Sequence, residues 1–189
     1  MFVLRRGEDE MVRITISGPA GSGTSTLSQV LMNRYGYTHL NGGDVFRQEA
    51  ERRGLSLRSF GTLCDDDPSV DKILDEHLRQ SMLAEGGPDI VESRLSGWWA
   101  YQLQIEIPRI CLQASIDARA HRVSEREGSE LETARSLAME RDSRDRRRLQ
   151  DLYGIDLASV EPYTLVLDTD GLSPDEVARQ VMEHMGVLS

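Results

Sequence analysis

A short segment that alternates polar with β-branched residues, 12–17, runs directly into a glycine-rich stretch, 18–23. This alternation is typical of a β-strand, and a helical spacing of apolar residues begins at Leu27. Between the two lies the spacing G-x-x-x-x-G-x-[ST]. Its glycines let successive backbone N–H groups point at a phosphate, and the following helix adds the positive end of its dipole. The unit predicts an α/β fold with a nucleotide phosphate site. The alternative is a glycine-rich turn without a ligand.

The glycine-rich segment departs from the common phosphate-loop pattern at one position. Thr24 stands where a lysine is expected, and Lys72, the only lysine of the chain, lies much further along. Ser25 falls at the position whose hydroxyl normally binds Mg²⁺. Without the lysine, the motif predicts a phosphate cradle and does not by itself establish catalysis. The residues expected to form this cradle are Gly18, Pro19, Ala20, Gly21, Ser22, Gly23, Thr24, Ser25 and Thr26.

The rest of the chain alternates short apolar segments with helical patterns. Strands are expected at 37–40, 89–92, 109–113 and 163–167, and helices at about 44–53, 70–85, 116–127 and 131–153. A last helix follows Ser173, which forms a capping box with Glu176. This alternation predicts a three-layer P-loop fold of about five parallel strands flanked by helices, with ligands beyond the carboxyl ends of the strands. We interpret residues 11–189 as one domain and residues 1–10 as an N-terminal extension.

Composition excludes several classes of partner. The net charge of −10 argues against a nucleic-acid-binding face, since phosphate backbones need clustered cations. No apolar run is long enough to cross a bilayer, and the first residues lack a secretory signal, so we expect a cytoplasmic protein with no membrane partner. All basic residues except Lys72 are arginines. Their number fits compositional bias, but any phosphate would have to be held by backbone amides and arginine forks.

Six segments together carry a resemblance to a known family. They are ITISGPAGSGTST, NGGDVFRQEAERRGLSL, DDDPSVDKILD, VESRLSGWW, HRVSEREG and RDSRDRRRLQDLYGID. In this order and spacing, the chain resembles the archaeal-type cytidylate kinases, which are nucleoside monophosphate kinases, over about residues 12–185. The resemblance implies transfer of the γ-phosphoryl group of ATP to CMP or dCMP with Mg²⁺. It also implies a monophosphate-binding flap at about 44–85 and a short lid at about 127–141. We expect a monomer.

The same resemblance assigns roles to individual residues. Arg141, Asp145 and Arg148 follow the family pattern R-D-x-R-D-x-x-R, and their spacing places them on one face of a helix. Ser93 replaces the glycine of the family's E-G-R segment, which puts acceptor identity in question. The resemblance implies ATP binding by the phosphate cradle at residues 18–26 and metal binding by Ser25. It also implies CMP binding by Asp44, Arg47, Arg94, Asp145 and Arg148, and catalytic roles for Arg122, Arg126 and Arg141.

Other charged and aromatic residues are interpreted as structural. We expect Arg144, Arg146 and Arg147 to form a solvated helix face paired with Asp142 and Asp151. The acidic run at 65–67 is interpreted as helix capping rather than as a metal site, and one of the tryptophans at 98 and 99 is expected in the core.

Two other functions stay open. The first is a kinase for a different nucleoside monophosphate or small acceptor. The second is a nucleotide-binding protein that has lost turnover together with the lysine. Acceptor-side arginines favour an enzyme, because a binder of ATP alone has no evident need for them.

Overall fold

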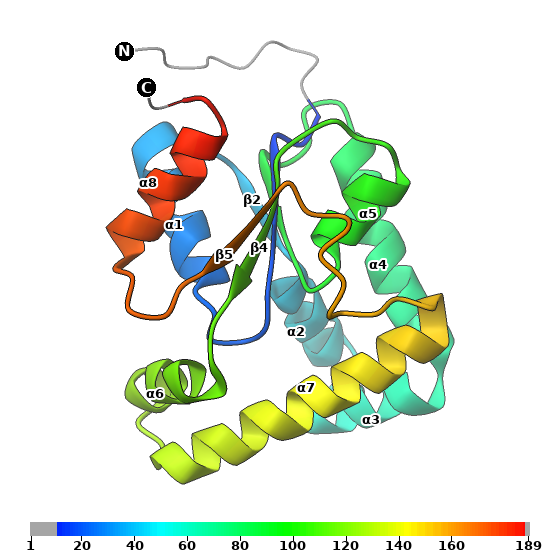
Figure 1. The fold of residues 1–189 in the computed structure, drawn as a ribbon. Helices are drawn as coiled ribbons and strands as arrows, with labels where there is room; N and C mark the ends of the chain where they lie inside the picture. Colours follow the sequence, from blue (N-terminus) through cyan, green and yellow to red (C-terminus); the bar gives the residue numbers. More distant parts are fainter. Residues whose placement is uncertain (1–10, 188–189) are drawn as a thin grey trace.

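Five parallel strands form the centre of the computed structural model, which describes residues 11–187 (Figure 1). Their order across the sheet is β2-β3-β1-β4-β5. The predicted strands are confirmed, with ends that shift by at most two residues, and so is the α/β class. The extension predicted at residues 1–10 lies outside the described residues. The strands are β1 (Ile14–Ser17), β2 (His39–Asn41), β3 (Ile90–Glu92), β4 (Arg109–Gln113) and β5 (Leu165–Asp168).

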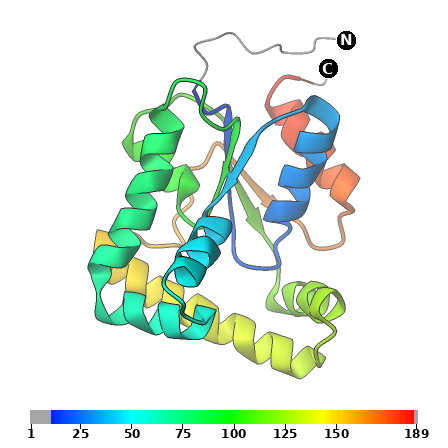
Figure 2. The same cartoon turned by 180° about the vertical axis from the view of Figure 1, so that it is seen from behind.

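Helices cover both faces of the sheet and its carboxyl end. α1 and α8 lie on one face, α4 and α5 lie on the other, and α2, α3, α6 and α7 gather at the end where the strands finish (Figures 1 and 2). The predicted helices are present, whereas α3 and α5 were not predicted. The helices are α1 (Thr24–Tyr35), α2 (Gly42–Arg52), α3 (Leu57–Asp66), α4 (Pro68–Leu83), α5 (Ser96–Gln102), α6 (Ile116–Glu127), α7 (Leu131–Tyr153) and α8 (Pro174–His184).

The sheet separates two apolar cores because successive side chains of a strand point to opposite faces. Ile90 of β3 packs in the core with α1 and α8, whereas its neighbour Val91 packs in the core with α4 and α5. Trp99 is buried in that second core, which confirms that one of the two tryptophans is a core residue. Central strand β1 is buried along its whole length, so the loop that follows it starts from a fixed point.

Short polar side chains fix where several helices begin. Asn41 caps α2 by accepting hydrogen bonds from the backbone N–H groups of Gly43 and Asp44. Asp67 caps α4, and the rest of the acidic run is exposed, which confirms the capping interpretation of residues 65–67. The capping box at the start of α8 is present as predicted. Because α2 begins immediately after β2, its first turn lies at the carboxyl end of the sheet.

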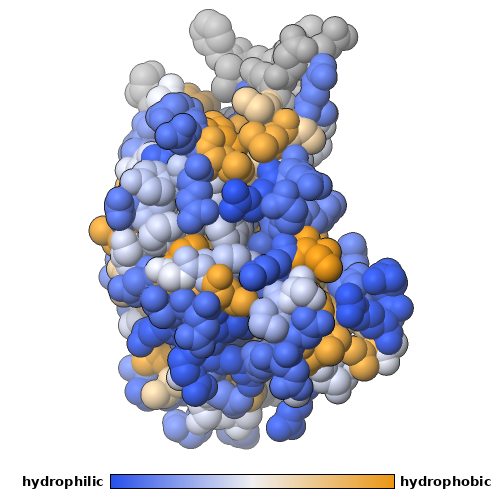
Figure 3. Space-filling model, turned by 90° about the vertical axis from the view of Figure 1, so that its right-hand side faces the viewer, coloured by the Kyte–Doolittle hydropathy of each residue, from blue (hydrophilic) through white to orange (hydrophobic). Residues whose placement is uncertain are grey.

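The outer face of α4 and α5 is mostly hydrophilic, with separate hydrophobic spots (Figure 3). Exposed apolar side chains on these helices include Ile73, Leu83 and Tyr101. Over residues 11–187, no helix has the length and apolar character that crossing a membrane requires.

Candidate active site

The loop between β1 and α1 has a backbone shape that suits a phosphate. A side chain at Gly18 would place its Cβ 2.5 Å from both the Leu112 carbonyl oxygen and Ser22 Oγ, so only glycine fits there. Gly23 is the N-cap residue of α1, and its φ of 98° is a left-handed conformation that favours glycine. Because glycine has no side chain, no side-chain hydrogen bond caps the start of the helix. The first N–H groups of α1 thus lack a side-chain cap and are available to an anion. All residues predicted to bind ATP lie on this loop and the first turn of α1.

A buried carboxylate lies beside the loop. Glu92, the last residue of β3, accepts a hydrogen bond of 2.7 Å from Ser25 Oγ and one of 3.0 Å from Ser28 Oγ. His39 Nε2 lies 2.9 Å from the same carboxylate. Burial raises the pKa of Glu92, but the hydrogen bonds with His39, Ser25 and Thr24 lower it below its ordinary value. Glu92 is therefore ionised at neutral pH and holds the Ser25 hydroxyl in place.

Ser25 and Glu92 together fit a hard cation such as Mg²⁺. Both offer oxygen atoms, the ligand type that Mg²⁺ prefers. Within residues 11–187, no group of three or more His, Cys, Asp or Glu side chains is arranged to hold a metal ion. A partly protein-bound ion completed by phosphate oxygens and water fits this sparse donor set, because Mg²⁺ usually keeps several of its waters.

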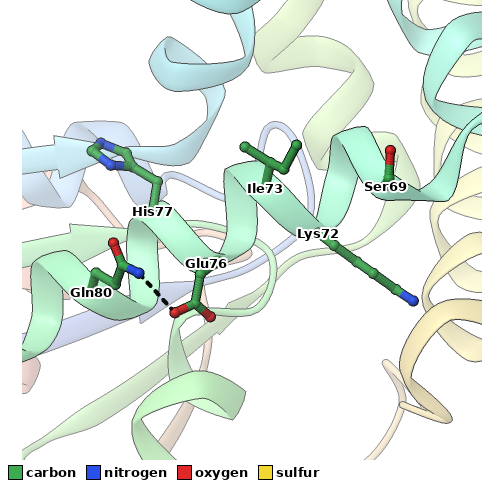
Figure 4. A pocket seen from close by; sticks show the side chains of 6 residues that line it. All are labelled: Ser69, Lys72, Ile73, Glu76, His77 and Gln80. Atoms are coloured by element: carbon green, nitrogen blue, oxygen red, sulfur yellow. Dashed lines mark hydrogen bonds between the residues drawn. The ribbon is translucent and has the colours of Figure 1, made fainter.

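No lysine takes the place of Thr24. Lys72 is exposed on α4, where it lines a shallow pocket with Ser69, Ile73 and other side chains of the same helix (Figure 4). That pocket includes no residue of the phosphate loop. The cationic side chains that line the cavity at the phosphate loop are instead arginines, Arg122 and Arg126.

A cavity of about 520 Å³ opens over the first turn of α1 and is lined by Arg122 and Arg126 of α6. Arg122 donates hydrogen bonds to the Gly21 carbonyl (3.2 Å) and to Thr169, both at Oγ1 (2.9 Å) and at the carbonyl (2.6 Å). The Thr169 hydroxyl donates in turn to the Ser22 carbonyl at 3.0 Å. Arg126 is exposed and pairs with Glu127. Through these hydrogen bonds, Arg122 connects α6 and the loop after β5 to the phosphate loop.

A second group of charges lies on α7. Asp145 is buried, and its carboxylate lies 2.9 Å from Arg94 and 3.3 Å from Arg148, with Arg141 at 4.0 Å. Arg141, Asp145 and Arg148 therefore share one face of the helix, as predicted. Arg94 arrives from the loop after β3, and Arg148 also lies 3.4 Å from Asp71 of α4. Side chains from three parts of the chain, α7, the loop after β3 and α4, thus form one charge cluster, with the Asp145 carboxylate at its centre.

The interpretation of Asp142 as part of a solvated face is wrong. Asp142 binds Arg119 of α6 and Arg94 rather than the arginines that follow it on α7. Arg144 pairs with Glu140, and the side chains of residues 146 and 147 are exposed. Burial raises the pKa of Asp142, but the guanidinium groups of Arg119 and Arg94 lower it below its ordinary value.

Asp44 and Arg47 are placed on the first turns of α2. Arg47 donates a hydrogen bond to Asp44, and both side chains are about half exposed. Among the interactions of residues 11–187, no hydrogen bond or ion pair joins them to the charges on α7. The structure therefore puts these two predicted residues at the carboxyl end of the sheet without bringing them into the cluster around Asp145.

Comparison with known proteins identifies the family. The profile of the cytidylate kinase-like family matches residues 13–171. The chain belongs to this family. It is 40% identical to the cytidylate kinase of Methanospirillum hungatei over 168 residues, which cover 88% of this chain and 92% of the relative. It is 39% identical to that of Pyrococcus horikoshii (94% and 91% covered) and 42% identical to that of Natronomonas pharaonis (90% and 86% covered).

Solved structures of small-molecule kinases share the fold. A gluconokinase from Sinorhizobium meliloti superimposes with a TM-score of 0.61 at 18% identity, covering 96% of this chain and 94% of that one. A shikimate kinase from Bacteroides thetaiotaomicron gives a TM-score of 0.57 at 13% identity, with 92% and 98% covered. The predicted P-loop kinase fold and the predicted family are both confirmed.

Sequence reasoning missed three charged residues of this cytidylate kinase-like site. Glu92, Asp71 and Arg119 are buried, yet none was predicted as a site residue. For Glu92 a signal was present, because it ends a buried strand next to β1. Asp71 and Arg119 carry no comparable local signal, since their partners lie on other elements.

Proposed function

We propose that the protein is a cytidylate kinase that transfers the γ-phosphoryl group of ATP to CMP or dCMP. The observation that carries this proposal is a glycine-rich loop on β1–α1, shaped to suit a phosphate, that is connected through Arg119 and Asp142 to a separate arginine cluster around Asp145. Relatives of 39–42% identity named cytidylate kinase support the choice of acceptor. One fold thus offers two anion sites, as a transfer between two nucleotides requires.

On the donor side, the backbone does most of the binding. The N–H groups of the loop and of the first turn of α1 would hold the ATP phosphates, and residues 18–26 supply them. The cavity above them, lined by Arg122, Leu172 and Pro174, would receive the nucleoside. Arg122 keeps the wall of this cavity attached to the loop through Thr169.

Mg²⁺ would be held by Ser25, with Glu92 orienting the hydroxyl and accepting from metal-bound water. The ion would neutralise charge on the β- and γ-phosphates when bound. The Glu92 carboxylate is anionic and buried next to the cradle, so a cation bound there would offset its charge.

On the acceptor side, side chains do the binding. Arg94 and Arg148 would hold the CMP phosphate, since planar guanidinium groups meet phosphate in a bidentate way. Asp145 would then accept a hydroxyl or amino hydrogen from the nucleoside. Asp44 and Arg47, which face solvent on α2, would join when this segment moves onto the acceptor.

The transfer itself needs positioning and charge stabilisation rather than a dedicated base. An oxygen of the CMP phosphate forms the new bond to the γ-phosphorus, and the bond to the β-phosphate oxygen of ATP breaks. Arg126 and Arg141 are exposed near the two sites and would neutralise the transferring group.

The test is a coupled assay of the purified protein with ATP and Mg²⁺ against CMP, dCMP, UMP, AMP and GMP. CMP or dCMP is expected to give the highest kcat/KM. A higher value for another monophosphate would replace the acceptor and leave the reaction class intact.

Thr24 favours a second candidate, a nucleotide-binding protein without turnover. This candidate predicts ATP binding by calorimetry but no CDP formation at any CMP concentration. Formation of CDP at a rate above the uncatalysed background excludes it.

We further infer that the protein acts as a monomer in the cytoplasm, where both nucleotides are available. Size-exclusion chromatography with light scattering tests this, and a stable dimer mass would contradict it.

A further inference from the structure

One carboxylate, Asp142, touches both sides of the site. Its Oδ2 accepts a hydrogen bond of 2.5 Å from Arg119, and its Oδ1 accepts one of 3.3 Å from Arg119 and another of 3.3 Å from Arg94. Arg119 belongs to α6, and Arg94 to the loop after β3. α7, which carries Asp142, runs below the carboxyl ends of the strands from α6 towards α3 and α4 (Figure 1).

Arg119 extends this connection to the phosphate loop. Its NH1 group donates to the Ala20 carbonyl at 3.3 Å. The backbone at Arg119 also packs against the loop, since a Cβ at Gly21 would lie 3.0 Å from the Arg119 carbonyl oxygen. The Arg119 side chain is 7% exposed, so it has no room to swing to another partner. The loop, Arg119, Asp142 and Arg94 therefore form one continuous set of contacts.

We propose that Asp142 is a positioning residue that holds Arg94 at a fixed distance from the phosphate loop, with Arg119 as the link. This inference rests on the proposed function, because it takes Arg94 as an acceptor-phosphate ligand. It gives a defined role to an acid that neither substrate needs to touch.

The contacts explain why Asp142 acts through Arg94 and not on the substrate. Both carboxylate oxygens are engaged by guanidinium groups, and a carboxylate has nothing to offer a phosphate except repulsion. Without Asp142, Arg94 keeps Asp145 as its one ion-pair partner among residues 11–187, and the buried Arg119 loses its counter-charge. Arg94 would then sample orientations that do not bring the acceptor in line with the donor phosphate, which is costly because in-line geometry governs transfer.

The experiment compares Asp142→Asn with Glu140→Gln. Both variants remove one acid from the same helix, but Glu140 pairs only with Arg144 on the outer surface. The measurements are kcat and KM for CMP and for ATP, CMP binding by calorimetry without ATP, and the urea unfolding midpoint. Asp142→Glu, which restores the charge on a longer side chain, serves as the rescue variant.

Asp142→Asn is expected to weaken CMP binding about tenfold and to lower kcat about fivefold, with KM for ATP within about twofold of the unmodified protein. Glu140→Gln should change none of these by more than about twofold. Asp142→Glu should recover part of the lost CMP affinity. In a double-variant cycle, Asp142→Asn and Arg119→Met should give less than the product of their separate effects, because they break the same link.

Unchanged CMP affinity and kcat in Asp142→Asn overturn the proposal, and so does a lowered unfolding midpoint with normal kinetics per folded molecule. The latter result would make the pair purely structural. Failure of the proposed function looks different, because the unmodified protein would then bind or phosphorylate another acceptor, or none. CMP binding measured without ATP separates the two, since it does not depend on turnover.

Discussion

The donor and acceptor sides of this site are built by different means. The proposed donor side is one contiguous loop whose backbone would do the binding, and its shape is enforced by glycines at positions 18 and 23. The acceptor side is assembled from side chains on α4, α6, α7 and the loop after β3, held by ion pairs. A backbone site is sensitive to added bulk, whereas a side-chain site is sensitive to lost charge. Substitutions on each side of the site test this difference.

The largest effect is expected from Gly18→Ala. The new methyl group would collide with a carbonyl oxygen and a buried hydroxyl, so the loop must distort. We expect kcat/KM for ATP to fall about a thousandfold, roughly 4 kcal/mol. Gly61→Ala in α3 is the control, since its methyl would meet only one arginine nitrogen at 3.6 Å. Normal kinetics in Gly18→Ala would show that the backbone cradle is not the donor site.

The next effect concerns a partly buried acid, Asp75 of α4, which interacts electrostatically with Asp71 and Arg148. Burial raises the pKa of Asp75 from 3.8 to about 6, although Tyr153 donates it a hydrogen bond of 2.7 Å. A carboxyl whose pKa is raised on folding adds stability below its unfolded pKa, and this stability is lost as pH rises through the folded pKa. Asp75→Asn should thus stabilise the protein relative to the unmodified chain at pH 7, by up to about 3 kcal/mol, but not at pH 4. Urea unfolding across pH 4 to 7 measures this, and parallel profiles for the two proteins would refute it.

A smaller effect is expected from Arg148→Ala. It removes a guanidinium group from the acceptor cluster and should weaken CMP binding or turnover at least about tenfold, or 1.4 kcal/mol. KM for ATP should stay close to normal. Arg147→Ala, at the exposed neighbouring position, is the control. Wild-type kinetics with CMP in Arg148→Ala would remove this residue from the acceptor site.

The smallest effect is expected from Arg47→Ala. Its exposed pair with Asp44 adds little to stability, so the free energy of unfolding should change by less than about 0.5 kcal/mol. KM for CMP should nevertheless rise about threefold if Arg47 reaches the acceptor during turnover. Arg52→Ala on the same helix should leave KM unchanged. An equal KM in both variants would assign Arg47 to the surface alone.

The same contrast explains what could be predicted from the sequence. The phosphate loop was predictable because its residues are consecutive and its conformation depends on local glycines. The shared face of Arg141, Asp145 and Arg148 followed from helical periodicity alone. The partner of Asp142 did not, because helix geometry allows several arginines nearby, and only the packing of α6 against α7 selects Arg119.

Two helices were missed for related reasons. α5 has only seven residues and contains Gly97, which weakens a helical signal. The structure requires glycine there because the Tyr163 ring occupies the space of any Cβ. α3 lies between two turn-like segments, and its buried face is formed by contacts with α2 and α4. In both cases packing against other elements, rather than local propensity, stabilises the helix.

Asp145 gives the acceptor cluster its own counter-ion before any substrate arrives. At the proposed acceptor site, a phosphate would have to displace this carboxylate from Arg94 and Arg148, so binding would exchange one anion for another. Simple monovalent anions gain little from such an exchange, whereas a doubly charged phosphate with a nucleoside attached gains both charge and new contacts. The cluster therefore resists occupation by ordinary salt, and CMP affinity should depend only weakly on chloride concentration.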